Sequence, residues 1–316
     1  MKLTIGTRGS ALALWQARHV AAAIEKVHST ISVELMTIKT QGDKILDTPL
    51  AQIGNKGLFT KEIEDALLAG KVDLAVHSMK DLPTDLPAGL EVAAVMQRED
   101  PRDAFISKDG RPLNELGTGA RIGTSSLRRK AFLLSHFPHL EVISVRGNVD
   151  TRLKKIETEH LAGVMLAAAG ILRLGYGDRV TSFLELDTMI PAIGQGALAI
   201  ETRTDDHRTW DVVAALNHDD TAQCVSVERA FLRRMGGGCQ VPMAAHCVID
   251  GDRLKVVAAV VHPDGAPMIR DVLAGPRGEA STGSKLADML IARGADAILR
   301  SVLDQDWEPG PTTDII

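Results

Sequence analysis

The sequence predicts an α/β protein built from two successive lobes around a cleft, followed by a small α+β domain. Strand-like apolar runs alternate with helical patterns in residues 3–78 and again in residues 121–175, which is typical of mostly parallel sheets. Residues 241–275 instead hold apolar runs separated by Asp-Gly turns, the pattern of a three-stranded antiparallel meander. At 316 residues, the chain is also longer than one hydrophobic core usually supports.

The first lobe is predicted from strands and helices that follow one another closely. The predicted strands are residues 3–6, 33–38 and 72–78, and the predicted helices are residues 11–27 and 58–70. Gly70 ends the second helix, since glycine is common directly after a helix C-terminus. The charged segment 98–105 contains a proline and is predicted to be a break where the chain crosses to the second lobe.

The second lobe repeats this alternation, and the third domain departs from it. The predicted elements are strands 121–124 and 141–147, helices 126–137 and 149–157, and a strand running into a helix over 162–175. Residues 188–201, with one proline and two glycines, form a second predicted crossing. In the third domain, helices within 285–303 are expected to cover the meander.

Composition and local patterns exclude several classes of protein. A net charge of −5 argues against a broad nucleic-acid-binding surface. The N-terminus lacks the pattern of a signal peptide, and the apolar runs are shorter than a membrane span. The three cysteines are widely spaced, which favours neither a disulfide framework nor a zinc site. We expect a cytoplasmic monomer with reduced thiols, without bound metal and without a nucleic-acid or membrane partner.

Cationic and hydroxyl side chains gather where predicted strands turn into helices. They are Thr7, Arg8 and Ser10, Lys56, Ser125, Ser126, Arg128 and Arg129, and Arg146, Asn148 and Arg152. A helix N-terminus already favours anions, and arginine adds a planar fork suited to carboxylate or phosphate. Each arginine alone could be an ordinary solvated charge. Together they predict a polyanion held across the cleft.

Lys80 and Asp81 follow the buried strand 72–78 at the same cleft. Asp81 could act as a general acid or base, or could stabilise a cation that develops in a substrate. It could equally form a surface pair with Lys80 or a turn before Pro83. His77, on the strand itself, is predicted to be a core histidine satisfied by backbone groups.

Several common catalytic motifs are missing from the sequence. We find no G-x-x-x-x-G-K-[ST] loop and no strand-linked G-x-G-x-x-G followed by a suitable acid. The segment GTSSL also lacks the G-x-S-x-G pattern of a hydrolase. The anion is therefore not expected to be ATP or NAD.

Cys239 follows three glycines in the segment GGGCQVP, where the open backbone allows close approach. A loop cysteine facing a basic cleft would have a lowered pKa and be reactive. Cys224 and Cys247 are most simply small core residues on a helix and a strand. The residues by themselves leave two possibilities, an anion-binding enzyme or a binding protein, with a reactive thiol supplied by the third domain.

The chain resembles the porphobilinogen deaminase family in a set of motifs that occur in the family order. They include TRGSALALWQA, VDLAVHSMKDLPT, REDPRDAF, GTSSLRRKA, RGNVDTRL, IPAIGQGALAIE and GGGCQVP, and they cover residues 1 to about 245. The resemblance implies two domains like type II periplasmic binding proteins, with the chain returning to the first domain before it enters the third. The implied domains are residues 1–98 with 197–216, residues 99–196, and residues 217–316.

The resemblance also implies a reaction and a cofactor. Four porphobilinogen molecules would be joined head to tail with loss of ammonia, and hydroxymethylbilane would be released. The chain would grow on a dipyrromethane cofactor attached through a thioether to Cys239. Asp81 would be the catalytic carboxylate. One departure from the family is Gln41, where some members have a basic residue; it bears only on the contacts of that loop.

The resemblance further assigns binding residues. The cofactor would be bound by Asp43, Ser78, Lys80, Asp81, Thr124, Ser126, Arg128, Arg129, Arg152 and Gly196. The substrate would be bound by Arg8, Ser10, Lys56, Arg146, Asn148, Arg152, Arg173 and Gln195. A competing hypothesis is an anion-binding module without catalysis, which leaves Asp81 and Cys239 unexplained.

Overall fold

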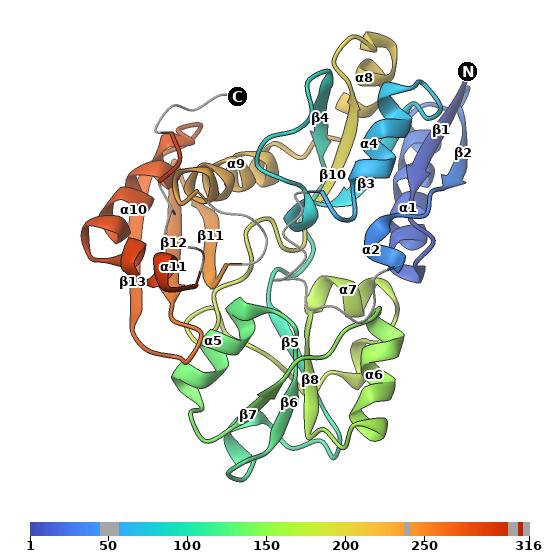
Figure 1. Cartoon of the computed structure of the whole chain (residues 1–316). Helices are drawn as coiled ribbons and strands as arrows, with labels where there is room; N and C mark the ends of the chain where they lie inside the picture. The colour runs from blue at the N-terminus through green and yellow to red at the C-terminus, as the bar shows by residue number, and fades with distance from the viewer. Residues whose placement is uncertain (45–56, 237–240, 303–308, 312–316) are drawn as a thin grey trace.

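A computed structural model of the chain describes residues 1–44, 57–236, 241–302 and 309–311 (Figure 1). Its strands form two five-stranded sheets and one three-stranded sheet. We refer to the elements around these sheets as the first lobe, the second lobe and the third unit. Figure 1 shows the first lobe above the second, with the third unit packed at their side. The predicted fold class is therefore confirmed.

The first lobe is built on a sheet with the strand order β2-β1-β3-β10-β4. Its elements are β1 (Lys2–Thr7), α1 (Ala11–Val27), β2 (Ser32–Thr37), α2 (Gln41–Lys44), α4 (Lys61–Leu68), β3 (Leu74–Ser78), β4 (Leu90–Val95), β10 (Leu198–Arg203) and α8 (His207–Ala214). Side chains of β3 alternate between two cores: Leu74 and Val76 pack in the cluster that contains α1 residues, and Ala75 packs against α4. Helices therefore cover both faces of this sheet.

The second lobe has the sheet order β7-β6-β8-β5-β9. Its elements are β5 (Asp103–Ser107), β6 (Arg121–Gly123), α5 (Leu127–His136), β7 (Glu141–Ile143), α6 (Val149–Thr158), β8 (Gly163–Ala167), α7 (Ala168–Arg173) and β9 (Ser182–Phe183). As in the first lobe, four strands run in one direction and one runs antiparallel between two of them.

The antiparallel strand of each lobe is the one that follows a crossing. β5 comes directly after the first crossing and pairs with β8, and β10 comes directly after the second crossing and pairs with β3. The chain thus returns to the first sheet after visiting the second lobe, as the resemblance implied. The domain boundaries themselves stay a prediction.

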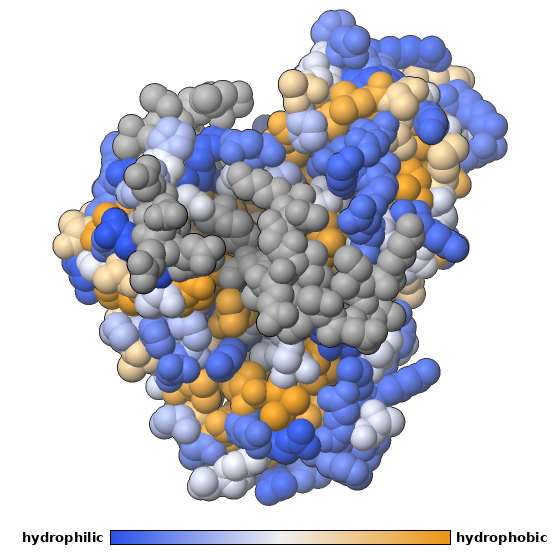
Figure 2. All heavy atoms as spheres, viewed as in Figure 1, coloured by the Kyte–Doolittle hydropathy of each residue, from blue (hydrophilic) through white to orange (hydrophobic). Residues whose placement is uncertain are grey.

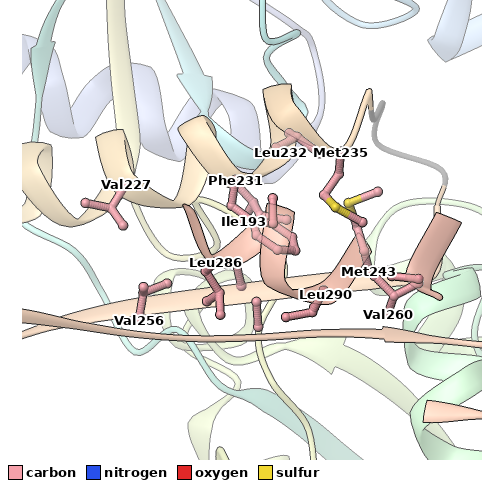
Figure 3. Packing of buried hydrophobic residues seen from close by; sticks show 14 of the residues in the cluster. Ile193, Val227, Phe231, Leu232, Met235, Met243, Val256, Val260, Leu286 and Leu290 are labelled. Atoms are coloured by element: carbon pink, nitrogen blue, oxygen red, sulfur yellow. The ribbon is translucent and has the colours of Figure 1, made fainter. Parts of the chain in front are cut away.

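The third unit is a meander covered by helices. Its elements are α9 (Asp219–Arg234), β11 (Met243–Asp250), β12 (Arg253–Val261), β13 (Met268–Pro276), α10 (Ser281–Ala292) and α11 (Ala295–Val302). Figure 3 shows Phe231 of α9, Leu286 and Leu290 of α10, and Val256 and Val260 of β12 packing together. Each fully buried side chain of this kind contributes about 1.5–3 kcal/mol. Cys224 and Cys247 are buried in the same core, as predicted.

Glu228 of α9 joins the two crossings to the third unit. Arg98 donates to both carboxylate oxygens at 2.7 and 3.0 Å, and the backbone N–H groups of Gly194 and Cys247 donate at 2.7 and 2.8 Å. Burial by itself would raise the pKa of Glu228, but the charge of Arg98 and the hydrogen bonds outweigh it and lower the pKa to about 2. The carboxylate is fully buried and stays ionised at neutral pH.

Three predicted segments differ from the structure in extent or character. The helix predicted over 58–70 is α4, which begins only at Lys61 because residues 57–60 form a turn in which Gly57 accepts from Thr60. The strand predicted over 141–147 ends at Ile143, where its pairing with β6 stops. The break predicted over 98–105 is wrong in its second half, because Asp103 begins the buried strand β5.

The surface shown in Figure 2 is mostly hydrophilic, with hydrophobic residues exposed in separate patches. The large apolar side chains most exposed among the described residues come from seven different elements: Val27, Met36, Leu68, Trp210, Val248, Val272 and Met289. Within the described ranges, none of the helices has the length and apolar character that a membrane span requires.

We predict that Glu228→Gln destabilises the protein by about 3–5 kcal/mol, because the substitution leaves the buried Arg98 guanidinium without a counter-ion. Chemical denaturation followed by circular dichroism would measure the change. The matched control is Asp220→Asn on the same helix, whose carboxylate is 53% exposed and pairs with Arg277. Equal effects of the two substitutions would show that Glu228 has no special structural role.

Candidate active site between the lobes

The larger cavity lies where both lobes and the third unit meet. It has a volume of about 690 Å³, including the part open to solvent. Its lining residues come from the first lobe (Lys80, Asp81), the second lobe (Ser126, Arg128, Arg129), the second crossing (Ala192, Ile193, Gln195) and the third unit (Leu232, Val241, Met243). The lobes therefore give the lining its cationic wall, and the third unit gives it an apolar wall.

A second cavity of about 450 Å³ lies within the first lobe. Its lining residues are Arg8, Ser10, Leu12, Ala13, Gln16, Phe59, Thr60, Ile63, Val76, His77, Ser78 and Asp81. Asp81 lines both cavities and is the one acidic residue among the described residues that line them. The two cavities therefore meet at this carboxylate.

A short 3-10 turn at Met79–Asp81 directly after β3 holds Asp81 in place. Met79 and Leu82 are 2% and 1% exposed and anchor the turn on either side of it, while the Asp81 side chain remains exposed. The Met79 N–H donates to the Ala197 carbonyl at 3.0 Å, which ties the turn to the second crossing. Asp81 is thus an exposed carboxylate on a firmly anchored backbone.

Arg128 and Arg129, in the first turn of α5, share one buried counter-ion. Arg128 Nη1 lies 2.7 Å from Asp103 Oδ2, and Arg129 Nε lies 2.9 Å from Asp103 Oδ1. Burial alone would raise the pKa of Asp103, but the two guanidinium groups hold it well below its usual range. The cluster keeps one excess positive charge. Arg128 Nε is buried and finds no hydrogen-bond partner among the described residues.

Lys80 and Arg152 are further cations close to this cluster. Lys80 Nζ donates to Gln195 Oε1 at 3.2 Å. Burial, followed by the charge of Arg129, lowers the pKa of Lys80 to about 8. Burial and the charges of Arg129 and Arg146 likewise lower the pKa of Arg152 to about 10. Burial is the larger cause of both shifts, and the neighbouring positive charges, which a polyanionic ligand would offset, add to it.

Gln195 connects the second crossing to the cationic cluster. Its side chain is fully buried, and Nε2 donates to Asp103 Oδ1 at 3.0 Å and to the Pro101 carbonyl at 2.7 Å. Its Oε1 faces Lys80 and Arg129. Gln195 therefore holds the two crossings together as well as lining the larger cavity.

Three predicted ligand residues cap the helices that begin at the cleft. Ser10 accepts from the Ala13 N–H at 3.3 Å, Ser126 from the Arg129 N–H at 3.4 Å, and Asn148 from the Thr151 N–H at 2.9 Å. Ser10 and Ser126 line the cavities, whereas Asn148 does not. Their side chains fix where α1, α5 and α6 begin.

Six other predicted residues are not among the residues that line the two cavities. They are Thr124, Arg146, Asn148, Arg152, Arg173 and Gly196. Arg173 Nη2 donates to the Gly196 carbonyl at 2.7 Å. Gly196 has φ +92°, and a Cβ there would lie 2.4 Å from the Glu99 carbonyl oxygen, so the close approach of the two crossings requires glycine.

Cys239, Lys56 and the side chain of Asp43 lie outside the described residues. The described chain stops at Gly236 and resumes at Val241, and Val241 lines the larger cavity together with Leu232 and Met243. The segment that carries Cys239 is therefore flanked by residues of the cavity wall.

The prediction for His77 is wrong in its partner. His77 Nε2 lies 2.9 Å from Glu201 Oε2, so a buried carboxylate and not a backbone group satisfies the imidazole. Sequence reasoning also missed Gln16, whose Nε2 donates to Ser78 Oγ at 2.9 Å, and Asp103, which lies in the segment interpreted as a break. An acidic residue at the start of an apolar run was the available signal for Asp103.

Within the described residues, no cluster of three or more histidine, cysteine or acidic side chains is arranged to hold a metal ion. The charged groups of the site are instead arranged for an organic anion. Carboxylates or phosphates would meet guanidinium and ammonium groups on one wall and a single carboxylate at the junction of the cavities.

Two family models cover most of the chain. Residues 3–211 match "Porphobilinogen deaminase, dipyromethane cofactor binding domain", and residues 222–292 match "Porphobilinogen deaminase, C-terminal domain". Both cavities are lined almost entirely by residues within these two ranges.

Curated relatives agree over nearly the full length. A porphobilinogen deaminase from Trichlorobacter lovleyi is 54% identical over 306 residues, covering 96% of this chain and 98% of its own. The enzyme from Syntrophotalea carbinolica is 53% identical, covering 98% of this chain and 98% of its own. The enzyme from Geobacter sulfurreducens is 50% identical, covering 96% of this chain and 96% of its own.

Solved structures with a similar fold are distant. A TRAP periplasmic solute binding protein from Desulfovibrio salexigens is 12% identical, with a TM-score of 0.41 over 69% of this chain and 72% of its own. An extracytoplasmic solute receptor from Bordetella pertussis is 11% identical, with a TM-score of 0.41 over 73% of this chain and 81% of its own. The fold class therefore rests on the sheets described above, and the two family models and the curated relatives decide the family. The chain belongs to the porphobilinogen deaminase (hydroxymethylbilane synthase) family, the transferases of tetrapyrrole biosynthesis.

Proposed function

We propose that this enzyme joins four porphobilinogen molecules head to tail on a dipyrromethane primer, loses one ammonia for each, and releases hydroxymethylbilane. The observation that carries the proposal is Asp81, the one acidic residue among the described residues that line the two cavities, placed where they meet. Membership of an enzyme family sets aside the binding module without catalysis.

The larger cavity fits a dipyrromethane group. Each of its rings carries an acetate and a propionate, which match the guanidinium and ammonium groups of Lys80, Arg128 and Arg129. The apolar wall of Leu232, Val241 and Met243 suits the faces of the pyrrole rings. When bound, the group supplies a carbon nucleophile at its free end.

We propose that Cys239 holds this group through a thioether. Val241 follows Cys239 by two residues and lines the same cavity, which supports a short reach from the sulfur to the cationic wall. Lys80, Ser126, Arg128, Arg129 and Arg152 would neutralise and orient its carboxylates. The other proposed cofactor-binding residues are Asp43, Ser78, Thr124 and Gly196.

The second cavity is proposed to receive the incoming porphobilinogen. Arg8 lies at 4.2 Å over the Phe59 ring, and both residues line the cavity with Ser10. The arginine suits the substrate carboxylates and the ring suits the pyrrole face. Lys56, Arg146, Asn148, Arg152, Arg173 and Gln195 would bind carboxylates of the growing chain, which gains two with each addition.

Asp81 is proposed to face the pyrrole nitrogens at the junction of the cavities. Loss of ammonia from porphobilinogen leaves an electron-poor azafulvene, and positive charge develops at ring nitrogens during addition. A carboxylate at hydrogen-bond distance stabilises that charge and moves the proton that must leave.

The proposed domains remain residues 1–98 with 197–216, residues 99–196, and residues 217–316. We also propose that the protein is a cytoplasmic monomer.

The freshly purified protein is predicted to have a mass, measured under denaturing conditions, that exceeds the polypeptide by one dipyrromethane group. Cys239→Ser should abolish the added mass, because no thioether can form. Cys224→Ser is the control and should keep it, since Cys224 is buried in the core of the third unit. A wild-type mass equal to that of the bare polypeptide would refute the covalent attachment.

Asp81→Asn is expected to lower kcat for porphobilinogen consumption by about 10²–10⁴-fold, because the amide neither stabilises positive charge nor accepts a proton. The KM should change little, since the proposed carboxylate-binding cations remain. Asp85→Asn is the control: this residue is 73% exposed and lies outside both cavities. Normal turnover by Asp81→Asn would remove the catalytic assignment.

Asp103→Asn is expected to destabilise the protein by about 3–5 kcal/mol, because Arg128 and Arg129 lose their buried counter-ion. Urea denaturation would measure it. Asp109→Asn, at an exposed aspartate paired with Arg111, should leave the denaturation midpoint unchanged. A normal midpoint for Asp103→Asn would show that the two guanidinium groups need no fixed anion.

A further inference from the structure

A buried group of titratable side chains lies beneath the second cavity and has no part in the mechanism above. His77 of β3 and Glu201 of β10 meet on the face of the first sheet that α4 covers, with Nε2 and Oε2 2.9 Å apart. Their side chains are 5% and 0% exposed. Glu201 lies opposite Ala75 in the strand register, two residues from His77, so the pair is diagonal on one face.

Glu64 of α4 is the third member of this group, and it is 5% exposed. Burial raises the pKa of Glu64; the Thr60 hydroxyl and the charge of His77 oppose the rise, and the negative charge of Glu201 adds to it. Oε1 of Glu64 and Oε1 of Glu201 are buried and have no hydrogen-bond partner within the described part of the chain. Glu64 therefore holds a proton more readily than a carboxyl group in water does.

A β-bulge in β4 lies beside Glu201. The register between β10 and β4 shifts between Ile200 and Glu201, and the extra residue is Ala93 of β4. Bulges of this kind are common beside active sites.

The group adjoins the cavity in which the proposed reaction takes place. His77 and Thr60, the residue before α4, line the second cavity together with Asp81. His77 also precedes Asp81 by only four residues, at the end of the same strand. The imidazole is therefore the member nearest to the substrate space.

The other charged side chains on the surrounding elements have partners or positions of their own. Arg203 of β10 donates to the Leu67 and Val72 carbonyls and to Asp206, and Asp65 of α4 pairs with Lys61. The remaining charged groups on these elements and across the cavity are Glu62, Asp73, Glu91, Arg8 and Asp81.

The proposed reaction needs a proton to be lent and returned within each cycle. In each addition a C–N bond of porphobilinogen breaks and a C–C bond forms. The amine, which enters the step in its neutral form, leaves as ammonia with one added proton, and the attacking carbon loses one proton. The amine leaves first, so a group must supply its proton before the carbon gives one back.

We propose that His77, Glu201 and Glu64 form a proton store for this exchange. The store releases one proton through His77 toward the second cavity when the amine leaves, and recovers it when the carbon loses its hydrogen. Glu201 and Glu64 act through His77 and are positioning residues. The inference rests on the proposed function and extends it beyond Asp81.

The test uses the cofactor-loaded enzyme with the variants His77→Gln and Glu64→Gln. Glu64→Gln imitates the shape of a protonated carboxyl, so the fold should persist, but its amide has no acidic proton to release. We expect kcat to fall by about tenfold or more with KM within about twofold. The store must begin protonated, so wild-type kcat should decline as pH rises, and this alkaline decline should flatten in both variants. Asp65→Asn, an exposed position on the same helix, is the control and should match wild type.

A second readout does not depend on turnover. Infrared difference spectra of a pH titration should show the C=O stretch of a buried protonated carboxyl in wild type and Asp65→Asn, and its loss in Glu64→Gln. Two results would overturn the inference: wild-type kcat in both variants, or a loss of kcat that parallels a lower melting temperature with an unchanged pH profile. If wild-type protein failed to consume porphobilinogen, the proposed function would fall, while the infrared result would still decide whether the group stores a proton.

Discussion

The fold depends most on one buried carboxylate, that of Glu228, because three separate parts of the chain meet there. Arg98 belongs to the first crossing, Gly194 to the second and Cys247 to the third unit, and all three donate to it. Burial removes the hydration of the Glu228 carboxylate, and only the complete set of donors compensates for that loss. The ion pair therefore acts as a joint that fixes how the lobes and the third unit meet, and the larger cavity is formed by that meeting.

The same principle shapes the cationic wall. Arg128 and Arg129 can be buried before any ligand arrives because Asp103 already neutralises part of their charge. Burying both guanidinium groups without Asp103 would cost too much free energy of folding. One carboxylate for each guanidinium would leave no net positive charge to attract a ligand. One anion between two guanidinium groups keeps the protein folded and the site still positive.

Much of the fold could be predicted from the sequence, because strand and helix periods are local properties. The helix at 11–27 and the meander in 241–275 have nearly the predicted extents. Asp103 and Glu201 could not be assigned, since their partners lie 25 or more residues away and depend on tertiary packing. Asp81 was identified because a strand end followed by an acid is a local signal, but its position at the junction of two cavities required the structure.

The exchange of strands at the two crossings has a mechanical consequence. The lobes are linked by two chain segments that touch, since the Glu99 N–H donates to the Gly196 carbonyl at 3.2 Å. A single linker would leave the lobes free to twist and swing in any direction. Two linkers side by side resist twisting and sliding, so relative motion is reduced to opening and closing about one axis. Motion about this axis changes the width of the cleft while the residues on its two walls stay in register.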